Sequence, residues 1–322
     1  MHMPKDAPAG QRGSKPARSP RNRTICTSVE DGQEYLGRCI QLSEPVESIG
    51  SVACTTILGD AFSVLPLLPK GSVDLIVADP PYNLSKTYGS TRFRKTDADE
   101  YEAYTRRWMS LAFPLLKPTG SAYVCCDWRS SLIVGRCLQA VLQVESRITW
   151  EREKGRGAKS RWKDCLEDVW FAVKSDSHVF NLDAVKVRRK VLAPYRADGK
   201  PKDWQESGSV RWRDTCPSNF WDDITVPFWS MPENTAHPTQ KPEKLAAKLI
   251  LASSNPGDIV LDPFLGSGTS SVAAKKLGRR YIGIEREPQY CIWAEQRLEK
   301  ADACRDIQGY ENGVFLDRRF KG

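Results

Sequence analysis

The chain has 322 residues, of which 40% are hydrophobic and 27% charged, and its formal net charge at pH 7 is +8. This is the composition of an ordinary globular chain with enough apolar residues for a large core. It contains no run near the ~20 consecutive apolar residues of a membrane helix, and its first residues lack the apolar stretch of a signal peptide. We therefore expect a cytoplasmic protein with no membrane partner.

The N-terminal segment is basic. Residues 1–24 carry six lysines and arginines against Asp6 alone, among many Pro, Gly, Ser and Ala residues. A segment of this composition has too little apolar surface to bury. We predict a disordered basic arm over residues 1–50, one domain over residues 51–302 and a tail over residues 303–322.

Seven short apolar runs follow, and each ends in polar or turn residues, as buried parallel strands do. They are Thr55–Leu58, Val73–Ala78, Ser121–Cys126, Arg147–Trp150, Val169–Val173, Ile259–Leu261 and Tyr281–Ile284. Helical patterns lie between them at Tyr101–Leu116, Ser130–Gln143, Glu243–Ser253, Thr269–Leu277 and Tyr290–Ala301. Alternating strands and helices predict an α/β fold with a doubly wound, mostly parallel sheet of seven strands.

The strand Val73–Ala78 ends abruptly in Asp79-Pro80-Pro81-Tyr82. Strand ends are where open α/β sheets bind ligands. Two prolines restrict the backbone and remove two N–H donors, which leaves carbonyl acceptors beside a carboxylate and an aromatic ring. This set suits an amino group on a nucleobase, because Asp79 and the Pro80 carbonyl can accept its two hydrogens and Tyr82 can stack on a flipped base. The alternative is a rigid turn with a packing tyrosine.

A second basic run lies between the strands that end at Trp150 and begin at Val169. It has six cations against Glu153 alone and is interleaved with two glycines and Trp162. Its composition suits a loop that follows a phosphate backbone, although a solvated surface explains it equally well. The candidate DNA contacts are Arg152, Lys154, Arg156, Lys159, Arg161 and Lys163.

Residues 176–234 break the alternation of strands and helices. They are rich in Arg, Lys and Pro, and four tryptophans are spread among their charges. We predict that this stretch is an inserted or appended recognition segment.

The segment from Asp258 to Thr269 is a strand that turns through glycines into a helix. Such a turn lets the backbone approach a ligand closely. Glu285 ends the next strand about 20 residues beyond Gly266, a spacing that suits a carboxylate bonded to two ribose hydroxyls. An adenosine-type cofactor is expected. A nicotinamide-dependent oxidoreductase is the alternative, but Ser271 stands where its third glycine would be, and the Gly-Lys-Ser/Thr of a P-loop is missing.

Metal ligation is not expected. The ten cysteines are scattered, no pair has CxxC spacing, and the chain has three histidines. No cluster resembles a zinc site, and we interpret the cysteines as mostly buried, reduced hydrophobic residues.

Four of these pieces, in their order along the chain, resemble the amino-methyltransferases of DNA restriction-modification systems. They are Gly59-Asp60-Ala61, Ser72 to Asn83, His237 to Pro242, and Asp262 to Thr269 with Gly283 to Glu285 after it. The resemblance extends roughly from Thr55 to Leu298 and is to the beta class, in which the catalytic motif precedes the cofactor glycines. It implies a Rossmann-like methyltransferase fold with circularly permuted motif order, S-adenosylmethionine as cofactor, and target recognition by residues 176–234.

The resemblance also implies a role for each matching residue. The catalytic motif is Asp79, Pro80, Pro81 and Tyr82. The cofactor's methionine part lies by Asp262, Phe264 and the turn Gly266, Ser267, Gly268 and Thr269, its ribose by Glu285, and its adenine by Asp60 and Ala61. The segment with His237, Thr239 and Lys241 leads into a helix whose start helps to bind the methionine carboxylate. A plain helix start beside Pro242, with the Lys241 side chain on the surface, is the alternative.

The implied activity is site-specific methylation of double-stranded DNA by base flipping. Asp79 at the head of the catalytic motif favours N6 of adenine, because N4-cytosine enzymes of this family usually have serine there; N4 of cytosine is the alternative. A non-catalytic nucleic-acid-binding protein is a third interpretation, disfavoured because both required sites are intact. The sequence leaves open the recognition sequence, the choice between monomer and homodimer, and whether a companion restriction endonuclease acts on the same site.

Overall fold

The computed structural model describes residues 19–89, 91–152, 160, 162–191, 195–198, 200–207, 210–318 and 320. Within these residues, eight strands form the main sheet. Their order is β1 (Thr55–Leu58), β15 (Arg280–Glu285), β14 (Ile259–Asp262), β2 (Val73–Ala78), β5 (Leu116–Asp127), β7 (Leu166–Val173), β6 (Gln143–Glu151) and β13 (Phe220–Trp221). Strand β7 is antiparallel to both neighbours, and the other neighbouring pairs are parallel. The expected mostly parallel sheet of an α/β fold is confirmed.

The predicted count of seven strands is wrong. All seven predicted runs form strands, and Phe220–Trp221 adds an eighth, β13, beside β6. Two residues are too few to show a periodic pattern. They become a strand only because the folded chain brings them alongside β6.

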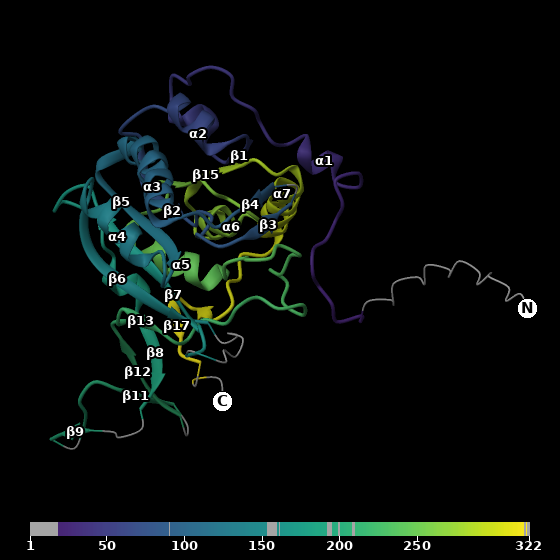
Figure 1. The fold of residues 1–322 in the computed structure, drawn as a ribbon. Helices are drawn as coiled ribbons and strands as arrows, with labels where there is room; N and C mark the ends of the chain where they lie inside the picture. The colour runs from purple at the N-terminus through teal and green to yellow at the C-terminus, as the bar shows by residue number, and fades with distance from the viewer. Residues whose placement is uncertain are drawn as a thin grey trace, which may run out of the picture.

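Helices cover both faces of the main sheet (Figure 1). In β2, Ile76 and Ala78 belong to one buried cluster and Leu75 and Val77 to another, because successive side chains of a strand point to opposite faces. The first cluster takes in α2 (Ala61–Val64), α3 (Ala98–Ala112) and α4 (Ser131–Gln139). The second takes in α5 (Glu243–Ser253), α6 (Thr269–Lys276) and α7 (Pro288–Ala303).

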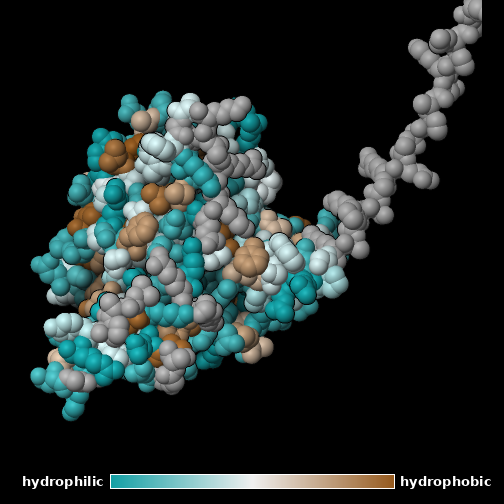
Figure 2. Space-filling model, turned by 90° about the horizontal axis from the view of Figure 1, so that it is seen from below, coloured by the Kyte–Doolittle hydropathy of each residue, from teal (hydrophilic) through white to brown (hydrophobic). Residues whose placement is uncertain are grey.

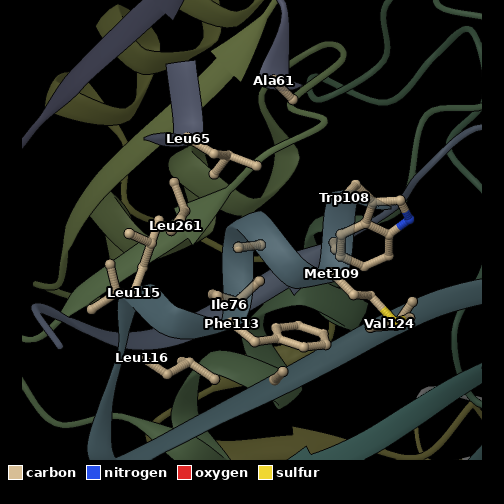
Figure 3. Packing of buried hydrophobic residues seen from close by; sticks show 14 of the residues in the cluster. Ala61, Leu65, Ile76, Trp108, Met109, Phe113, Leu115, Leu116, Val124 and Leu261 are labelled. Carbon is tan, nitrogen blue, oxygen red and sulfur yellow. The ribbon is translucent and has the colours of Figure 1, made fainter. Parts of the chain in front are cut away.

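Helix α3 starts at a capping residue and ends near a proline. The Asp97 carboxylate accepts a hydrogen bond from Glu100 N at 2.8 Å, which satisfies a free N–H of the first turn. Pro114 stops the helix, so the predicted extension to Leu116 is too long, and that residue begins β5 instead. Figure 3 shows the Trp108 ring of this helix beside Met109 in the core, where it packs edge-on against Phe113 with ring centroids 5.7 Å apart.

A second sheet, of five strands within the described residues, contains three strands of the predicted recognition segment and part of the predicted tail, whereas β13 of that segment belongs to the main sheet. Its order is β11 (Gln205–Ser207), β12 (Val210–Thr215), β8 (Val187–Lys190), β17 (Val314–Leu316) and β16 (Tyr310–Glu311). Strands β8, β11 and β12 project away from the main sheet in Figure 1. Helix α5 is buried along its whole length, because Leu249 packs toward the main sheet and Ala247 and Leu251 pack toward the second. This helix therefore joins the two sheets.

Residues 19–50 pack on the domain, so the prediction of a disordered arm over residues 1–50 is wrong for this part. Ile25 and the short helix α1 (Gln33–Leu36) lie against Tyr290 and Trp293 of α7. The Trp293 indole also donates to the Thr27 carbonyl at 3.0 Å. A few apolar residues opposite an apolar helix face order the segment, and its composition does not reveal that face. Residues 1–18 lie outside the described residues.

The remaining described elements are small. Two hairpins pair β3 (Lys86–Tyr88) with β4 (Thr91–Phe93) and β9 (Arg196–Ala197) with β10 (Lys200–Pro201). No helix in the described part of the chain has both the length and the apolar character that crossing a bilayer requires. In Figure 2, hydrophobic residues on the visible face lie as separate spots among hydrophilic ones.

Four of the ten cysteines are buried: Cys125, Cys126, Cys137 and Cys291. The expectation that most are buried is therefore wrong. The buried ones lie in β5, α4 and α7, whereas the exposed ones lie between regular elements, where apolar patterning gives no guide to burial. Among the described residues, no three His, Cys, Asp or Glu side chains gather as a metal-ion site.

Candidate active site

The two predicted motifs meet at the carboxyl edge of the main sheet. Strands β2 and β14 are neighbours; Asp79 follows the first, and the glycine turn follows the second. From β2 the chain crosses to β5 on one side, and from β14 it crosses to β15 on the other. Open α/β sheets bind ligands at such a switch point, because the diverging connections leave a crevice. Here the crevice is a pocket of about 220 Å³.

Every residue predicted for catalysis or cofactor binding, except Gly268, lines this pocket. The lining set is Asp60, Ala61, Asp79, Pro80, Pro81, Tyr82, His237, Thr239, Lys241, Asp262, Phe264, Gly266, Ser267, Thr269 and Glu285. Gly268 has a φ of +86°, and a Cβ there would lie 2.7 Å from the Ala294 Cβ of α7. It therefore allows the tight turn and the close approach of α7 without lining the pocket.

At the catalytic end of the pocket, both oxygens of the Asp79 carboxylate accept a hydrogen bond. The Tyr82 hydroxyl donates to Oδ1 at 2.9 Å, and Lys241 Nζ donates to Oδ2 at 2.6 Å. The Tyr101 hydroxyl donates to the Pro81 carbonyl at 3.2 Å, which ties the proline turn to α3. A carboxylate, a phenol and an ammonium thus converge beside a rigid turn.

Glu167, which we did not predict, contacts Tyr82 and Lys241 at this end without lining the pocket itself. Its buried carboxylate accepts from the Tyr82 hydroxyl at 3.1 Å, lies 3.4 Å from Lys241 Nζ and is bonded to the Arg152 guanidinium. Glu167 is near the start of β7, and because β7 is antiparallel, its start lies at the edge where its neighbours end. Residues at strand starts reach this edge only through an antiparallel strand, and the run Val169–Val173 does not reveal its direction.

The Lys241 ammonium is nearly buried, with 11% of the side chain exposed. Burial alone would lower its pKa, but the carboxylates of Asp79 and Glu167 outweigh burial and raise the pKa above its usual value. The ammonium therefore stays charged. The alternative in which this side chain lies on the surface is wrong, and the expected contact with the cofactor stays a prediction.

At the cofactor end, two carboxylates accept hydrogen bonds mainly from backbone N–H groups. Glu285 accepts from Gly266 N and Glu287 N, both at 2.8 Å. Asp262 accepts from Phe264 N at 2.9 Å and from a serine hydroxyl of α6. Burial raises the pKa of both, to about 7 for Asp262, and these hydrogen bonds offset part of the rise. Each oxygen has a further lone pair for a ligand.

The glycine turn is held from behind by Arg297, another residue that we did not predict. Its buried guanidinium donates to the Ser267 carbonyl at 2.7 Å and to Thr269 Oγ1 at 3.0 Å. It also donates to Glu243 Oε1 at 2.9 Å, which ties the turn to α5. An arginine in the last turns of an otherwise apolar helix face is the signal that could have identified it.

The segment before α5 departs in part from expectation. The helix begins at Glu243 as predicted, but the Glu243 N–H already donates to Glu233 Oε2 at 2.8 Å. This N–H donor of the helix start is thus already used by the protein's own carboxylate. Burial lowers the pKa of His237 to about 3, so its imidazole is neutral, and its ring packs edge-on against Tyr290 with centroids 4.4 Å apart.

Asp60 and Ala61 lie at the start of α2. Asp60 Oδ1 accepts from Phe62 N at 2.8 Å, so the side chain caps this helix. Arg286 Nη1 lies 3.7 Å from Oδ2. A contact of these residues with the cofactor's adenine stays a prediction.

The predicted DNA-binding run falls mostly outside the described residues, where Lys154, Arg156, Lys159 and Arg161 lie. Arg152 is described, and its guanidinium is bonded to Glu167 while 37% of its side chain is exposed. Lys163 is exposed. Arg152, the first residue of the run, is therefore hydrogen-bonded to a side chain at the catalytic end of the pocket.

Known proteins resemble this chain over most of its length. The sequence profile of a family described as DNA methylase, of N6/N4 methyltransferases, matches residues 73–296. The chain is 33% identical over 268 residues to the type II methyltransferase M.HpaI of Haemophilus parainfluenzae, covering 82% of this chain and 78% of that protein. It is 35% identical over 260 residues to the DNA adenine methyltransferase YhdJ of Escherichia coli (strain K12), covering 78% of this chain and 85% of that protein.

Solved structures are also similar. The M1.HpyAVI–SAM complex superposes with a TM-score of 0.51 at 28% identity, covering 76% of this chain and 98% of that one. The PvuII DNA methyltransferase, which is cytosine-N4-specific, superposes with a TM-score of 0.57 at 20% identity, covering 82% of this chain and 94% of that one. At that identity the second likeness supports the fold alone.

Proposed function

The chain belongs to the N6/N4 DNA methylase family, and from this premise we propose that it transfers a methyl group from S-adenosylmethionine to N6 of adenine in duplex DNA, at a specific sequence. The observation that carries the proposal is the convergence of the Asp79 motif and the glycine turn on one pocket. A methyl donor and an amine acceptor have to meet there for the reaction to occur. We also propose that it works in the cytoplasm of a bacterium, where such DNA lies.

The cofactor end of the pocket fits S-adenosylmethionine by its own chemistry. Gly266 has a φ of +54°, and a Cβ there would come within 3.2 Å of His237 Nε2, so glycine keeps the turn open to a ligand. Glu285 suits the ribose hydroxyls, and the Asp262 carboxyl group lines the pocket where the methionine part is expected. When bound, S-adenosylmethionine supplies an electrophilic methyl group on a sulfonium.

The catalytic end compensates for a weak nucleophile. The lone pair of an exocyclic amine is delocalised into the base, so the nitrogen reacts poorly until it becomes more tetrahedral. We propose that Asp79 and the Pro80 carbonyl accept its two hydrogens and that Tyr82 stacks on the flipped base. The Asp79 carboxylate then stabilises the positive charge that develops on nitrogen, until the proton leaves to solvent.

Two features favour adenine as the target base. Aspartate heads the motif where N4-cytosine enzymes of this family usually have serine, and the similar protein YhdJ is a DNA adenine methyltransferase. N4 of cytosine is the second candidate. The PvuII enzyme does not strengthen it, because its likeness extends to the fold alone.

We propose that the second sheet, within residues 176–234 and the C-terminal strands, reads the DNA sequence. Arginines on β8 and β12 are each held by a carboxylate: Arg188 by Asp214 at 2.8 Å, Arg211 by Glu206 at 3.0 Å and Arg213 by Asp203 at 3.0 Å. An arginine fixed in this way can present its remaining N–H donors to a base edge or a phosphate.

Mapping of methylated positions tests the proposal. Duplex DNA is incubated with the protein and S-adenosylmethionine, and modified bases are identified by mass and located by sequencing. We expect N6-methyladenine in one sequence context. N4-methylcytosine alone would favour the second candidate, and DNA binding without methylation would favour a non-catalytic protein. Thermal stabilisation by S-adenosylmethionine but not by NAD separates the methyltransferase from an oxidoreductase.

A further inference from the structure

The Asp79 carboxylate has a donor on each oxygen, which limits how a target amine can reach it. Tyr82 is bonded to Oδ1 and Lys241 to Oδ2, and 24% of the Asp79 side chain is exposed. An amine that bonds to this carboxylate has to displace one of the two donors or share an oxygen with it. A buried ammonium left without an acceptor is strongly unfavourable, so a displaced Lys241 needs a new partner.

Glu167 Oε2 provides that partner. It lies 3.4 Å from Lys241 Nζ, and the Tyr82 hydroxyl is shared between it and Asp79. A rotation of the Lys241 side chain is enough to close this distance. The backbone stays in place, because Thr269 Oγ1 donates to the Lys241 carbonyl at 2.9 Å. The ammonium is therefore already placed between two carboxylates.

The surrounding charges make such an exchange easy. Arg152 is bonded to the other oxygen of Glu167, so Oε2 faces Tyr82 and Lys241. Asp79 and Glu167 face the cations Lys241, Arg152 and, farther off, Lys86. Moving the ammonium from Asp79 to Glu167 leaves the net charge of the nearly buried cluster unchanged, so no new charge has to be desolvated.

We propose that Glu167 is a positioning residue for methyl transfer, whose carboxylate takes over the Lys241 ammonium when the target amine bonds to Asp79. Asp79 then faces the amine as an anion with a free oxygen instead of as half of an ion pair. The inference rests on the proposed function, since the amine of a DNA base is the group that displaces Lys241. It holds for adenine and cytosine alike.

The first test compares Glu167→Gln with a matched control. The amide keeps the size of the side chain and one acceptor oxygen but loses the charge that attracts Lys241. Asp168→Asn is the control, because the neighbouring buried carboxylate points to the other face of β7 and is bonded to Thr149 at 2.9 Å. With DNA and S-adenosylmethionine saturating, we expect single-turnover methylation by Glu167→Gln to fall about 10- to 100-fold, the range for one charge-assisted hydrogen bond. Binding of both ligands, and the rate of the control, should change by no more than about twofold.

The second test removes the ammonium. If Glu167 acts by drawing Lys241 away from Asp79, its charge is no longer needed in a Lys241→Met background. Glu167→Gln should then cost no more than about twofold, against about 10- to 100-fold in the parent. Glu167→Asp, which keeps the charge, should be faster than Glu167→Gln, and it provides the comparison if the amide variant folds poorly.

The outcomes separate this inference from the proposed function. A parent protein that does not methylate DNA refutes the proposed function, whatever Glu167 does. If the parent methylates DNA, two results overturn the role of Glu167 alone. One is that Glu167→Gln methylates at the parent rate, and the other is that Glu167→Gln lowers the rate equally in the parent and in the Lys241→Met background. An equal loss in both backgrounds is what a purely structural carboxylate would produce.

Discussion

The two ends of the pocket hold their carboxylates in opposite ways. At the cofactor end, Glu285 is bonded by two backbone N–H groups, and Asp262 by one backbone N–H and one hydroxyl. At the catalytic end, Asp79 and Glu167 are bonded by the side chains of Tyr82, Lys241 and Arg152. The carboxylates of the cofactor end are thus held mainly by the backbone, and those of the catalytic end by long side chains that can change partners.

This difference matches what each end has to do. A cofactor of constant shape is bound best by groups that do not move, since preorganised groups lose little entropy on binding. A base that enters from outside the protein needs a carboxylate whose partners can give way. Backbone donors cannot leave Glu285, whereas Lys241 has a second carboxylate within reach.

The largest effect is expected from a substitution at the catalytic end. Asp79→Ala removes the acceptor for the target amine, and we expect turnover to fall on the order of 10²- to 10³-fold, equivalent to ~3 to 4 kcal/mol. DNA binding should survive, because phosphate contacts made elsewhere dominate affinity. Single-turnover methylation with both ligands saturating isolates this step. Asp79→Asn keeps one acceptor oxygen but loses the negative charge, so its rate shows whether the hydrogen bond or the charge matters. Methylation by Asp79→Ala at the parent rate would show that the motif has no catalytic role.

The next largest effect is expected from a substitution that changes the cofactor end alone. Glu285→Ala removes a carboxylate expected at the ribose, and we expect the dissociation constant for S-adenosylmethionine to rise about 10- to 100-fold, with DNA affinity unchanged. Titration calorimetry measures the change. Glu295→Ala is the matched control, because that carboxylate is bonded to Thr56 outside the pocket. Equal affinity in Glu285→Ala and the parent would exclude Glu285 from the site.

A third prediction tests whether the cofactor turn is rigid because of its packing. Gly268 and Gly278 both have positive φ, +86° and +74°, but a Cβ meets Ala294 at the first position and nothing within 4 Å at the second. Alanine strains the backbone equally at both. We expect Gly268→Ala to lower the free energy of unfolding by about 1 to 3 kcal/mol more than Gly278→Ala, owing to overpacking. Urea denaturation measures both, and equal losses would show that α7 adjusts freely.

The smallest effect concerns pH at the cofactor end. Asp262 has a pKa of about 7 in the fold against an ordinary 3.8, because burial disfavours its charge. Between these values the folded state holds a proton that the unfolded chain has lost, so stability falls as pH rises from about 4 to 7 and changes no further above that range. We expect the melting temperature of the parent to fall by a few degrees more than that of Asp262→Asn between pH 5 and pH 8. Parallel curves would show that Asp262 keeps its ordinary pKa.

Patterns local to the chain predicted the framework well. The seven apolar runs became strands, and α5 spans Glu243–Ser253 as predicted, since burial on both faces of a sheet requires such runs. Two of the errors lie where partners far along the chain decide. Phe220–Trp221 is a strand only beside β6, and residues 19–50 pack against α7 and against the first core cluster.

The sequence by itself determined the two ends of the pocket. Asp79-Pro80-Pro81-Tyr82 and the glycine turn each act through their own backbone geometry. Each also follows a strand of a parallel pair, so both lie at the same edge of the sheet. Only the tertiary structure decided what surrounds Asp79. Lys241 precedes α5, Glu167 starts an antiparallel strand, and Arg152 follows β6, so no spacing along the chain relates them. They meet because buried charges must be paired, and which charges are buried together depends on how the sheet is assembled.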